Sequence, residues 1–192
     1  MAASLRRLLP LVILVAGAPL AIAEDVENPY YKFWRKSKPG ATTVVKETTK
    51  LSGAAADEAT DVKTITYKLA ELTDDKAVVE VRVIQQENFG TVESAPTRHT
   101  YPAKMSKEAL EDFLEETGAK GTPATLTVGD NKDMKVMAIT GTMKKKGDET
   151  VDFKIWLSDE VPGGIVKRIR TDKVKGEVVA ETTTELVSFK KE

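Results

Sequence analysis

The 192-residue sequence contains no cysteine. Disulfide bonds, thiol chemistry and cysteine-ligated metal sites are therefore excluded. A lipid-modified cysteine near the N-terminus, the mark of a bacterial lipoprotein, is excluded as well. The single histidine, His99, does not provide a multi-histidine metal site. As a general base it lacks an evident partner, so we interpret it as an ordinary strand-end residue.

Recognisable catalytic and metal-binding motifs are also missing. Asp159 with Glu160, like Asp74 with Asp75, is an adjacent pair, and neighbours on an extended chain point to opposite faces, which suits paired acids poorly. The segment 129–133, GDNKD, lacks the alternating ligands of a calcium loop and is predicted to be a hairpin turn. No phosphate loop or nucleophile elbow occurs. We predict no catalytic residue, no metal site and no cofactor.

The one long apolar run opens the chain as MAASLRRLLPLVILVAGAPLAIA. Residues 8–23 are few for a membrane span of about 20 residues, and two prolines and a glycine interrupt them. A basic start at Arg6 and Arg7 and an A-x-A motif at 21–23 are typical of a cleaved signal peptide. A membrane anchor is the alternative interpretation. No later segment is apolar enough to cross a bilayer.

We therefore predict a signal peptide at 1–23 and a single exported domain at 24–192, periplasmic or extracellular. A cysteine-free exported protein fits a bacterial periplasm best. Removing Arg6 and Arg7 from the 29 basic residues leaves 27 against 30 acidic ones. A nucleic-acid-binding protein is usually basic, so no nucleic-acid partner is expected.

What the sequence does have is alternation of apolar and polar residues from Gly40 onward. Ile65, Tyr67 and Leu69 fall on one side of one segment, and Val79, Val81 and Val83 on one side of the next. A polar turn at 73–76 makes these two segments a hairpin. Further turns at 145–148 and 172–176 separate three more alternating segments. This pattern predicts about nine antiparallel strands, four before and five after the segment that breaks the alternation.

That segment is predicted to be a helix over residues 106–117. Ser106 is the expected N-cap and Gly118 the C-cap, and an apolar stripe includes Leu110, Phe113 and Leu114. A helix with one apolar stripe packs on a sheet. We predict a mostly β, α+β fold: a curved antiparallel sheet or half-open barrel covered by this helix. A two-sheet sandwich is the competing form.

The stretch IWLSDEVPGGIVK, residues 155–167, is interpreted as a structural corner. Proline ends a strand and the two glycines permit a sharp reversal, so the corner comprises Trp156, Pro162, Gly163 and Gly164, with the tryptophan covering it. Residues 33–49 resemble residues 155–171 in placing a tryptophan before Pro-Gly and a strand. This is either a faint internal repeat or a coincidence.

Two surface features leave alternatives open. The segment NPYYKFW, residues 28–34, is either a partner surface or a terminal segment tied onto the core; its aromatic residues are Tyr30, Tyr31, Phe33 and Trp34. Lys144–Lys146 with Lys167, Arg168 and Arg170 form either a basic patch or a turn followed by an edge strand protected by its charges.

The exported, mostly antiparallel sheet with one covering helix resembles the periplasmic lipoprotein-carrier superfamily. That resemblance implies a half-open barrel that holds acyl chains between sheet and helix. The segment from Trp156 to Lys167 is similar to segments of exported bacterial sheet proteins of uncharacterised role.

The first functional hypothesis is a non-catalytic exported protein with a hydrophobic, lipid or acyl ligand in a cleft between sheet and helix. The predicted ligand contacts are Leu110, Phe113, Leu114, Met137 and Met143. The alternative is a cell-envelope protein–protein interaction module, and the third hypothesis is a hydrolase whose residues only the fold brings together. Ligand identity, oligomeric state and strand order do not follow from the sequence.

Overall fold

A computed structural model describes residues 25–52, 60–87 and 90–192, so the predicted signal peptide lies outside the described residues. In these ranges the first half holds the strands β1 (Asp25–Glu27), β2 (Thr42–Leu51), β3 (Thr60–Leu72), β4 (Lys76–Glu87), β5 (Gly90–Glu93), β6 (Thr97–Pro102) and β7 (Lys104–Ser106), with the helix α1 (Pro29–Trp34). The second half holds α2 (Lys107–Thr117) and the strands β8 (Lys120–Val128), β9 (Asn131–Lys144), β10 (Glu149–Leu157), β11 (Ile165–Val174) and β12 (Glu177–Lys190).

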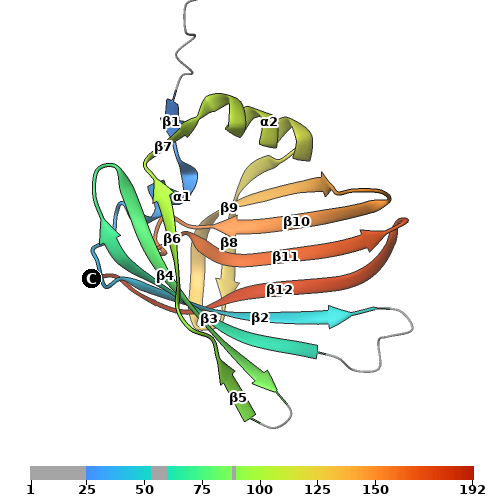
Figure 1. The fold of residues 1–192 in the computed structure, drawn as a ribbon, viewed down its shortest axis with the longest axis horizontal. Coiled ribbons are helices and arrows are strands. Elements are labelled where there is room, and N and C mark those ends of the chain that lie inside the picture. The colour runs from blue at the N-terminus through green and yellow to red at the C-terminus, as the bar shows by residue number, and fades with distance from the viewer. Residues whose placement is uncertain (1–24, 53–59, 88–89) are drawn as a thin grey trace, which may run out of the picture.

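Ten of these strands form one antiparallel sheet in the order β5-β4-β3-β2-β12-β11-β10-β9-β8, with β6 also paired to β4. Strands β1 and β7 form a separate small ladder. Five of the pairings contain a register shift, and bulges of this kind bend and twist a sheet. The sheet is strongly curved (Figure 1), and in the described residues its edge strands β8, β5 and β6 are not paired with one another. The predicted curved antiparallel sheet, open as a half-barrel, is confirmed.

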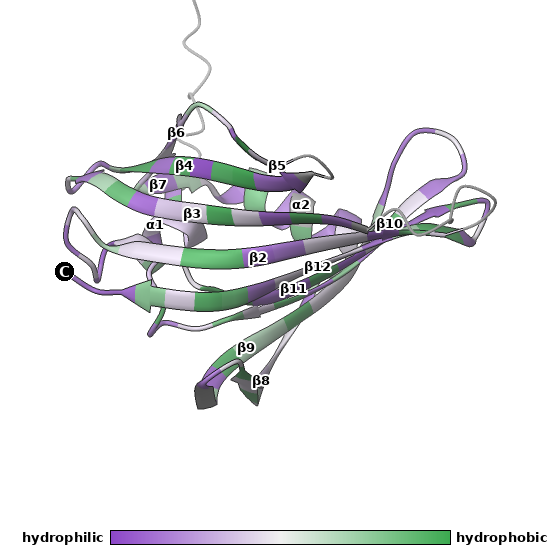
Figure 2. Ribbon diagram, turned by 90° about the horizontal axis from the view of Figure 1, so that it is seen from below, coloured by the Kyte–Doolittle hydropathy of each residue, from purple (hydrophilic) through white to green (hydrophobic). Residues whose placement is uncertain are grey.

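The five strands expected after the helix are all present, whereas the first half has more strands than the sequence pattern indicated. The additional ones, β1, β5 and β7, are three or four residues long. Such lengths are too short to show a period of two. Along β3 and β4, hydrophilic and hydrophobic residues alternate visibly (Figure 2). This alternation is why the long strands are readable from sequence.

Helix α2 has the ends that the sequence predicted. Ser106 is the N-cap, and its hydroxyl accepts a hydrogen bond of 3.2 Å from the backbone N–H of Ala109. Gly118 ends the helix in the left-handed conformation, with φ of +59°. Neither helix in the described residues is long and apolar enough to cross a membrane. Figure 1 shows α2 lying across the open side of the curved sheet.

Helix α1 was not predicted as a helix. Asn28 caps it by accepting a 3.0 Å hydrogen bond from the N–H of Tyr30, and Pro29 occupies the first turn, where its missing N–H costs nothing. The Tyr31 hydroxyl donates to the carbonyl of Thr73 at 2.9 Å. Tyr31 and Trp34 are buried against Leu69 and Val79 in one of two core clusters.

The second core cluster lies around the tip of the hairpin formed by β8 and β9. These two strands continue past the end of β10, and their tip packs on residues of the corner and of β11 and β12. Its buried members are Val128, Met134, Val136, Val161, Val166 and Leu186. Trp156 packs on this cluster and carries Lys154 over its ring, 4.7 Å from the centroid.

The segment 158–164 is a corner, and Trp34 of α1 packs against its glycines. A Cβ on Gly163 would lie 2.6 Å from Cζ2 of Trp34, and a Cβ on Gly164 would lie 2.6 Å from Cγ of Phe33. The Thr43 hydroxyl donates to the carbonyl of Pro162 at 2.6 Å. The two stretches that resemble each other in sequence therefore pack against one another.

One expectation for the basic residues is wrong. Strand β11, which carries Lys167, Arg168 and Arg170, is not an edge strand but pairs with β10 and β12. Alternation along a strand sends Lys167 to one face and the two arginines to the other. From sequence, β11 has the same pattern of charges as a protected edge strand. The two cases cannot be told apart, because charged residues also occupy the middle of this sheet.

Candidate ligand-binding site

Both helices lie on one face of the sheet, which we call the concave face. Helix α1 contacts β3 and β4 through Leu69 and Val79, and it also lines a pocket with β9 and β10. One helix can contact both halves of a curved sheet only from inside its curve. The end of α2 lies on the same face, because a Cβ on Gly141 of β9 would lie 2.9 Å from the carbonyl oxygen of Thr117.

Strand register shows how polarity changes across the concave face. Cross-strand partners point to the same side of a sheet, so each chain of partners is one row across the face. The first row runs from β9 to β3 through Ile139, Ile155, Arg168, Thr184, Glu47 and Lys63. The next row runs through Gly141, Phe153, Arg170, Thr182, Thr49 and Asp61. Both rows are apolar or glycine on β9 and β10 and become polar from β11 onward.

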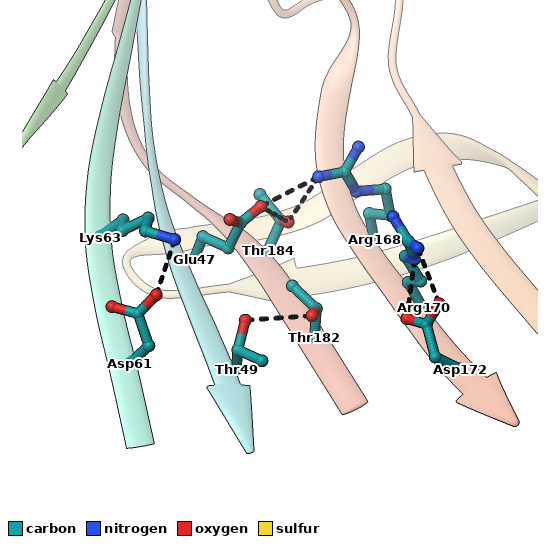
Figure 3. Close-up of polar contacts among 9 residues, drawn as sticks. All are labelled: Glu47, Thr49, Asp61, Lys63, Arg168, Arg170, Asp172, Thr182 and Thr184. Carbon is teal, nitrogen blue, oxygen red and sulfur yellow. Dashed lines mark hydrogen bonds and ion pairs between the residues drawn. The ribbon is translucent and has the colours of Figure 1, made fainter. Parts of the chain in front are cut away.

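We call the polar part of these rows the polar band; its residues are drawn in Figure 3. Arg168 Nη2 lies 3.0 Å from Glu47 Oε2, and the Thr184 hydroxyl bonds to the same carboxylate oxygen at 3.3 Å. The hydroxyls of Thr49 and Thr182 are 3.0 Å apart. These contacts join β2, β12 and β11 through side chains as well as through the backbone ladder.

Two further ion pairs of the polar band join residues two apart on one strand. Arg170 donates two hydrogen bonds to Asp172, at 2.8 and 2.7 Å, and Lys63 Nζ lies 2.6 Å from Asp61 Oδ2. The Arg170 guanidinium lowers the pKa of Asp172, whose carboxylate raises the pKa of Arg170 in return. Among the described residues, Arg168 Nε is buried without a hydrogen-bond partner. The band is thus a mostly satisfied network of fixed charges, which an apolar ligand would not displace.

Tyr67 lies beside the polar band on β3. Burial raises the pKa of its phenol, while the positive charge of Arg168 opposes that rise and the negative charge of Glu47 adds to it. Burial also raises the pKa of Tyr101 on β6. Both phenols therefore remain neutral over the physiological pH range.

The apolar end of the concave face contains a pocket of about 570 Å³ between α1, β9 and β10, which we call the α1 pocket. Small-molecule sites have volumes of about 300–1,000 Å³. Its lining residues are Glu27, Pro29, Lys32, Phe33, Lys135, Val136, Met137, Ile139, Leu157 and Asp159. The apolar members form a floor on β9 and β10 and a wall on α1, and the charged members stand around them.

Local sequence explains why this pocket has a wall. The Phe33 ring occupies the space that a side chain at position 164 would need, so α1 rests directly on the corner. Gly163 and Gly164 have φ of +75° and +81°, which glycine adopts readily. An ion pair also holds this wall in place, with Lys36 Nζ 2.8 Å from Asp159 Oδ2. Lys36 lowers the pKa of Asp159, and Lys32 and Arg35 contribute through their charges.

The predicted ligand contacts fall in three places. Met137, which is 43% exposed, lines the α1 pocket, whereas Met143 lies further along the same face of β9 opposite Val151. On α2, Leu110 is half-buried and Leu114 is 42% exposed, and neither lines the α1 pocket. The side chain of Phe113 lies outside what the structure describes. The pocket is therefore beside α1 rather than directly under the middle of α2.

The aromatic residues near the N-terminus divide by environment. Tyr31 and Trp34 are buried, Phe33 is half-buried in the α1 pocket, and Tyr30 is 64% exposed. The Tyr30 ring stacks on Tyr101, with centroids 5.5 Å apart. Of these four residues, Tyr30 has the most exposed side chain.

Other residues considered for chemistry are dispersed. His99 is exposed on β6, and its Nε2 lies 3.4 Å from the Thr97 hydroxyl. Asp159 is engaged with Lys36, and the N–H of Glu160 donates to the Ser158 hydroxyl at 3.3 Å. Within the described ranges, no group of three or more histidine or acidic residues is placed to hold a metal ion.

Sequence reasoning did not identify Phe33, Ile139 and Leu157 as members of one pocket. The signal for two of them was present, since Ile139 shares a strand face with Met137, and Leu157 is the cross-strand partner of Met137. The wall from α1 carried no such signal, because a contact between position 33 and position 164 has no local pattern.

Comparison with protein-family models gives no match, and comparison with curated proteins gives none either. Among solved structures, MucB in complex with MucA(peri) is similar at a TM-score of 0.39 and 9% identity, over 84% of this chain and 53% of that chain. The present chain thus spans about half the length of MucB.

Two smaller structures are covered almost entirely. A LolA superfamily protein from Nitrosomonas europaea matches at a TM-score of 0.27 and 9% identity, over 85% of this chain and 90% of that chain. A proposed outer membrane lipoprotein-sorting protein domain from Vibrio parahaemolyticus matches at 0.28 and 9%, over 84% and 89%. The architecture that the sequence resemblance implied, a curved antiparallel sheet left open and covered by a helix, is the one that the chain's own structure has.

Proposed function

We propose that this protein is an exported, non-catalytic binding protein that holds a hydrophobic ligand, such as an acyl chain, in the α1 pocket. The observation that supports this most directly is the division of the concave face. Its β9–β10 side is apolar and hollowed to about 570 Å³, and the polar band closes off the rest. A methionine in such a floor, here Met137, adapts to irregular apolar guests because its side chain is unbranched and flexible.

Helix α2 supports the same proposal. It rests on the sheet where Gly141 admits the carbonyl oxygen of Thr117, and the Phe153 ring fills the rest of that space. Leu114 nevertheless remains 42% exposed. A covering helix that leaves apolar side chains partly exposed can close further over a ligand without breaking a packed core.

The test is native mass spectrometry of the protein purified from its source without detergent. We expect a bound mass that dissociates on denaturation and is identified as an acyl compound. An Ile139→Asp variant, which places a charge in the pocket floor, should lose that mass. Ile169→Asp is the matched control, because Ile169 lies on β11 on the opposite face of the sheet from Arg168. Ligand-free protein that also ignores added fatty acids would refute the proposal.

A second candidate function is a cell-envelope protein–protein interaction, favoured by the exposed Tyr30 ring stacked on Tyr101 beside the edge strand β6. Exposed aromatic residues are enriched at protein interfaces. A photo-crosslinking residue at position 30 should then capture one defined partner in living cells, whereas the same residue at position 38 should not. Equal labelling from both positions would count against this surface.

A further inference from the structure

The entrance of the α1 pocket carries an excess of positive charge. Two carboxylates, Glu27 and Asp159, line it together with Lys32 and Lys135. Each carboxylate already holds another cation: Arg35 pairs with Glu27, and Lys36 pairs with Asp159. Four cationic side chains thus surround two anionic ones.

Lys32 and Lys135 are the cations in excess. Across residues 25–52, 60–87 and 90–192, neither ammonium group has a carboxylate within ion-pair distance. Both side chains are exposed, so their charges are solvated and available. They come from different elements of the pocket, Lys32 from the α1 wall and Lys135 from β9, and the apolar residues Met137, Ile139 and Leu157 line the same pocket.

We infer that the α1 pocket selects anionic amphiphiles taken up one molecule at a time. Their carboxylate, phosphate or sulfate head group would lie between Lys32 and Lys135 and their chain on Met137, Ile139 and Leu157. This inference rests on the proposed function and adds the class of the ligand's head group. The tail supplies most of the affinity through burial of apolar surface, and the lysines supply the choice of charge. Exposed ion pairs alone are too weak to hold a small anion.

The experiment measures binding of three amphiphiles with the same twelve-carbon chain, by calorimetry at pH 8 and below their micelle concentrations. Laurate is anionic, dodecyl maltoside is neutral and dodecyltrimethylammonium is cationic. We expect laurate to bind most tightly. The variant with both Lys32→Met and Lys135→Met keeps the apolar stems and should lose laurate affinity by roughly two- to thirtyfold, with little change for dodecyl maltoside.

Lys38→Met is the matched control, because Lys38 lies on the same basic segment but does not line the pocket. It should leave the preference for laurate unchanged. Raising ionic strength from about 0.01 M to 0.15 M should narrow the preference, because these charges are exposed. Equal binding of the three amphiphiles, or an unchanged preference in the double variant, would overturn the inference and leave the proposed function standing.

Three other results separate the remaining explanations. Failure of all three amphiphiles to bind would overturn the proposed function and this inference together. If inorganic phosphate competed for the α1 pocket as strongly as laurate does, the pocket would be a plain anion site. That result would overturn the role of the ligand's hydrocarbon chain. Binding to anionic phospholipid vesicles without binding of monomeric laurate would show attachment to a membrane surface, and would overturn uptake of single molecules.

Discussion

The contact between Trp34 and the corner at Gly163 can be tested by adding one methyl group. In Gly163→Ala, the new Cβ would lie 2.6 Å from Cζ2 and 3.0 Å from Cε2 of Trp34, closer than carbon atoms approach. The residue also has φ of +75°, where an alanine is strained by about 1–2 kcal/mol. Overpacking a core adds about 1–3 kcal/mol, so we expect a total loss of about 2–5 kcal/mol in the free energy of unfolding.

Gly176→Ala provides the matched control. Gly176 has φ of +83°, but a Cβ there would have no neighbour within 4 Å. This variant should lose only the backbone term, about 1–2 kcal/mol. Any gain from a stiffer unfolded chain is the same in both variants and cancels in their difference. The difference, about 1–3 kcal/mol, therefore measures the contact with Trp34.

The assay is urea unfolding followed by circular dichroism, with midpoints compared at equal slope. A double-mutant cycle sharpens it: in a Trp34→Leu background, Gly163→Ala should cost close to what Gly176→Ala costs. Our account of the corner is refuted if Gly163→Ala and Gly176→Ala are equally destabilising. It would also fail if Trp34→Leu left the cost of Gly163→Ala unchanged.

Three further predictions concern capping and pH. Ser106→Ala should lower the free energy of unfolding by about 1 kcal/mol through loss of the α2 cap, whereas Ser106→Asp should retain most of it; urea midpoints check both. Burial raises the pKa of Tyr67, so the contribution of the Tyr67 phenol to stability is full below about pH 10 and is lost as the pH rises through the raised value. Tyr67→Phe should flatten that alkaline loss of stability, measured by melting curves from about pH 8 to 11.5. Arg170 lowers the pKa of Asp172, so the contribution of the Asp172 carboxylate to stability is present above about pH 4 and is lost as the pH falls through the lowered value. The Asp172→Asn variant should be less stable at pH 7, but its stability should fall less steeply in acid.

Local signals in the sequence were sufficient for the long strands and for α2. The hairpin of β3 and β4 follows from apolar residues at 65, 67, 69 and 79, 81, 83, which the register confirms as facing pairs. The caps of α2 were readable because each depends on one residue, Ser106 or Gly118. Short-range chemistry of this kind does not depend on the rest of the fold.

Helix α1 shows why the remainder could not be predicted. Its six residues are mostly aromatic and give no helical period, and they fold as a helix because Asn28 caps them and the core binds Tyr31 and Trp34. The contact of Trp34 with Gly163 joins residues more than a hundred positions apart. Tertiary contacts of that separation leave no local pattern.

The sequence also could not show which residues of a strand lie on the concave face of the sheet. Alternation in β11 separates Lys167 from Arg168, but it does not say which of them faces inward. In the structure Arg168 lies on the concave face beside Glu47, and Lys167 pairs with Glu185 on the other face at 2.7 Å. The polar band is formed by cross-strand partners, so it can be recognised only once the strand order is known. The same holds for the boundary of the apolar pocket.

The measurement that tests the central claim most directly is a methyl-selective NMR titration of the purified chain with laurate. The α1 pocket predicts that the methyl signals of Met137, Ile139 and Leu157 shift together and saturate at one laurate per chain. The methyl signals of Thr49 and Thr182, in the polar band, should remain in place. Absence of any shift, or shifts centred on the polar band with the pocket methyls unmoved, would contradict a ligand site beside α1.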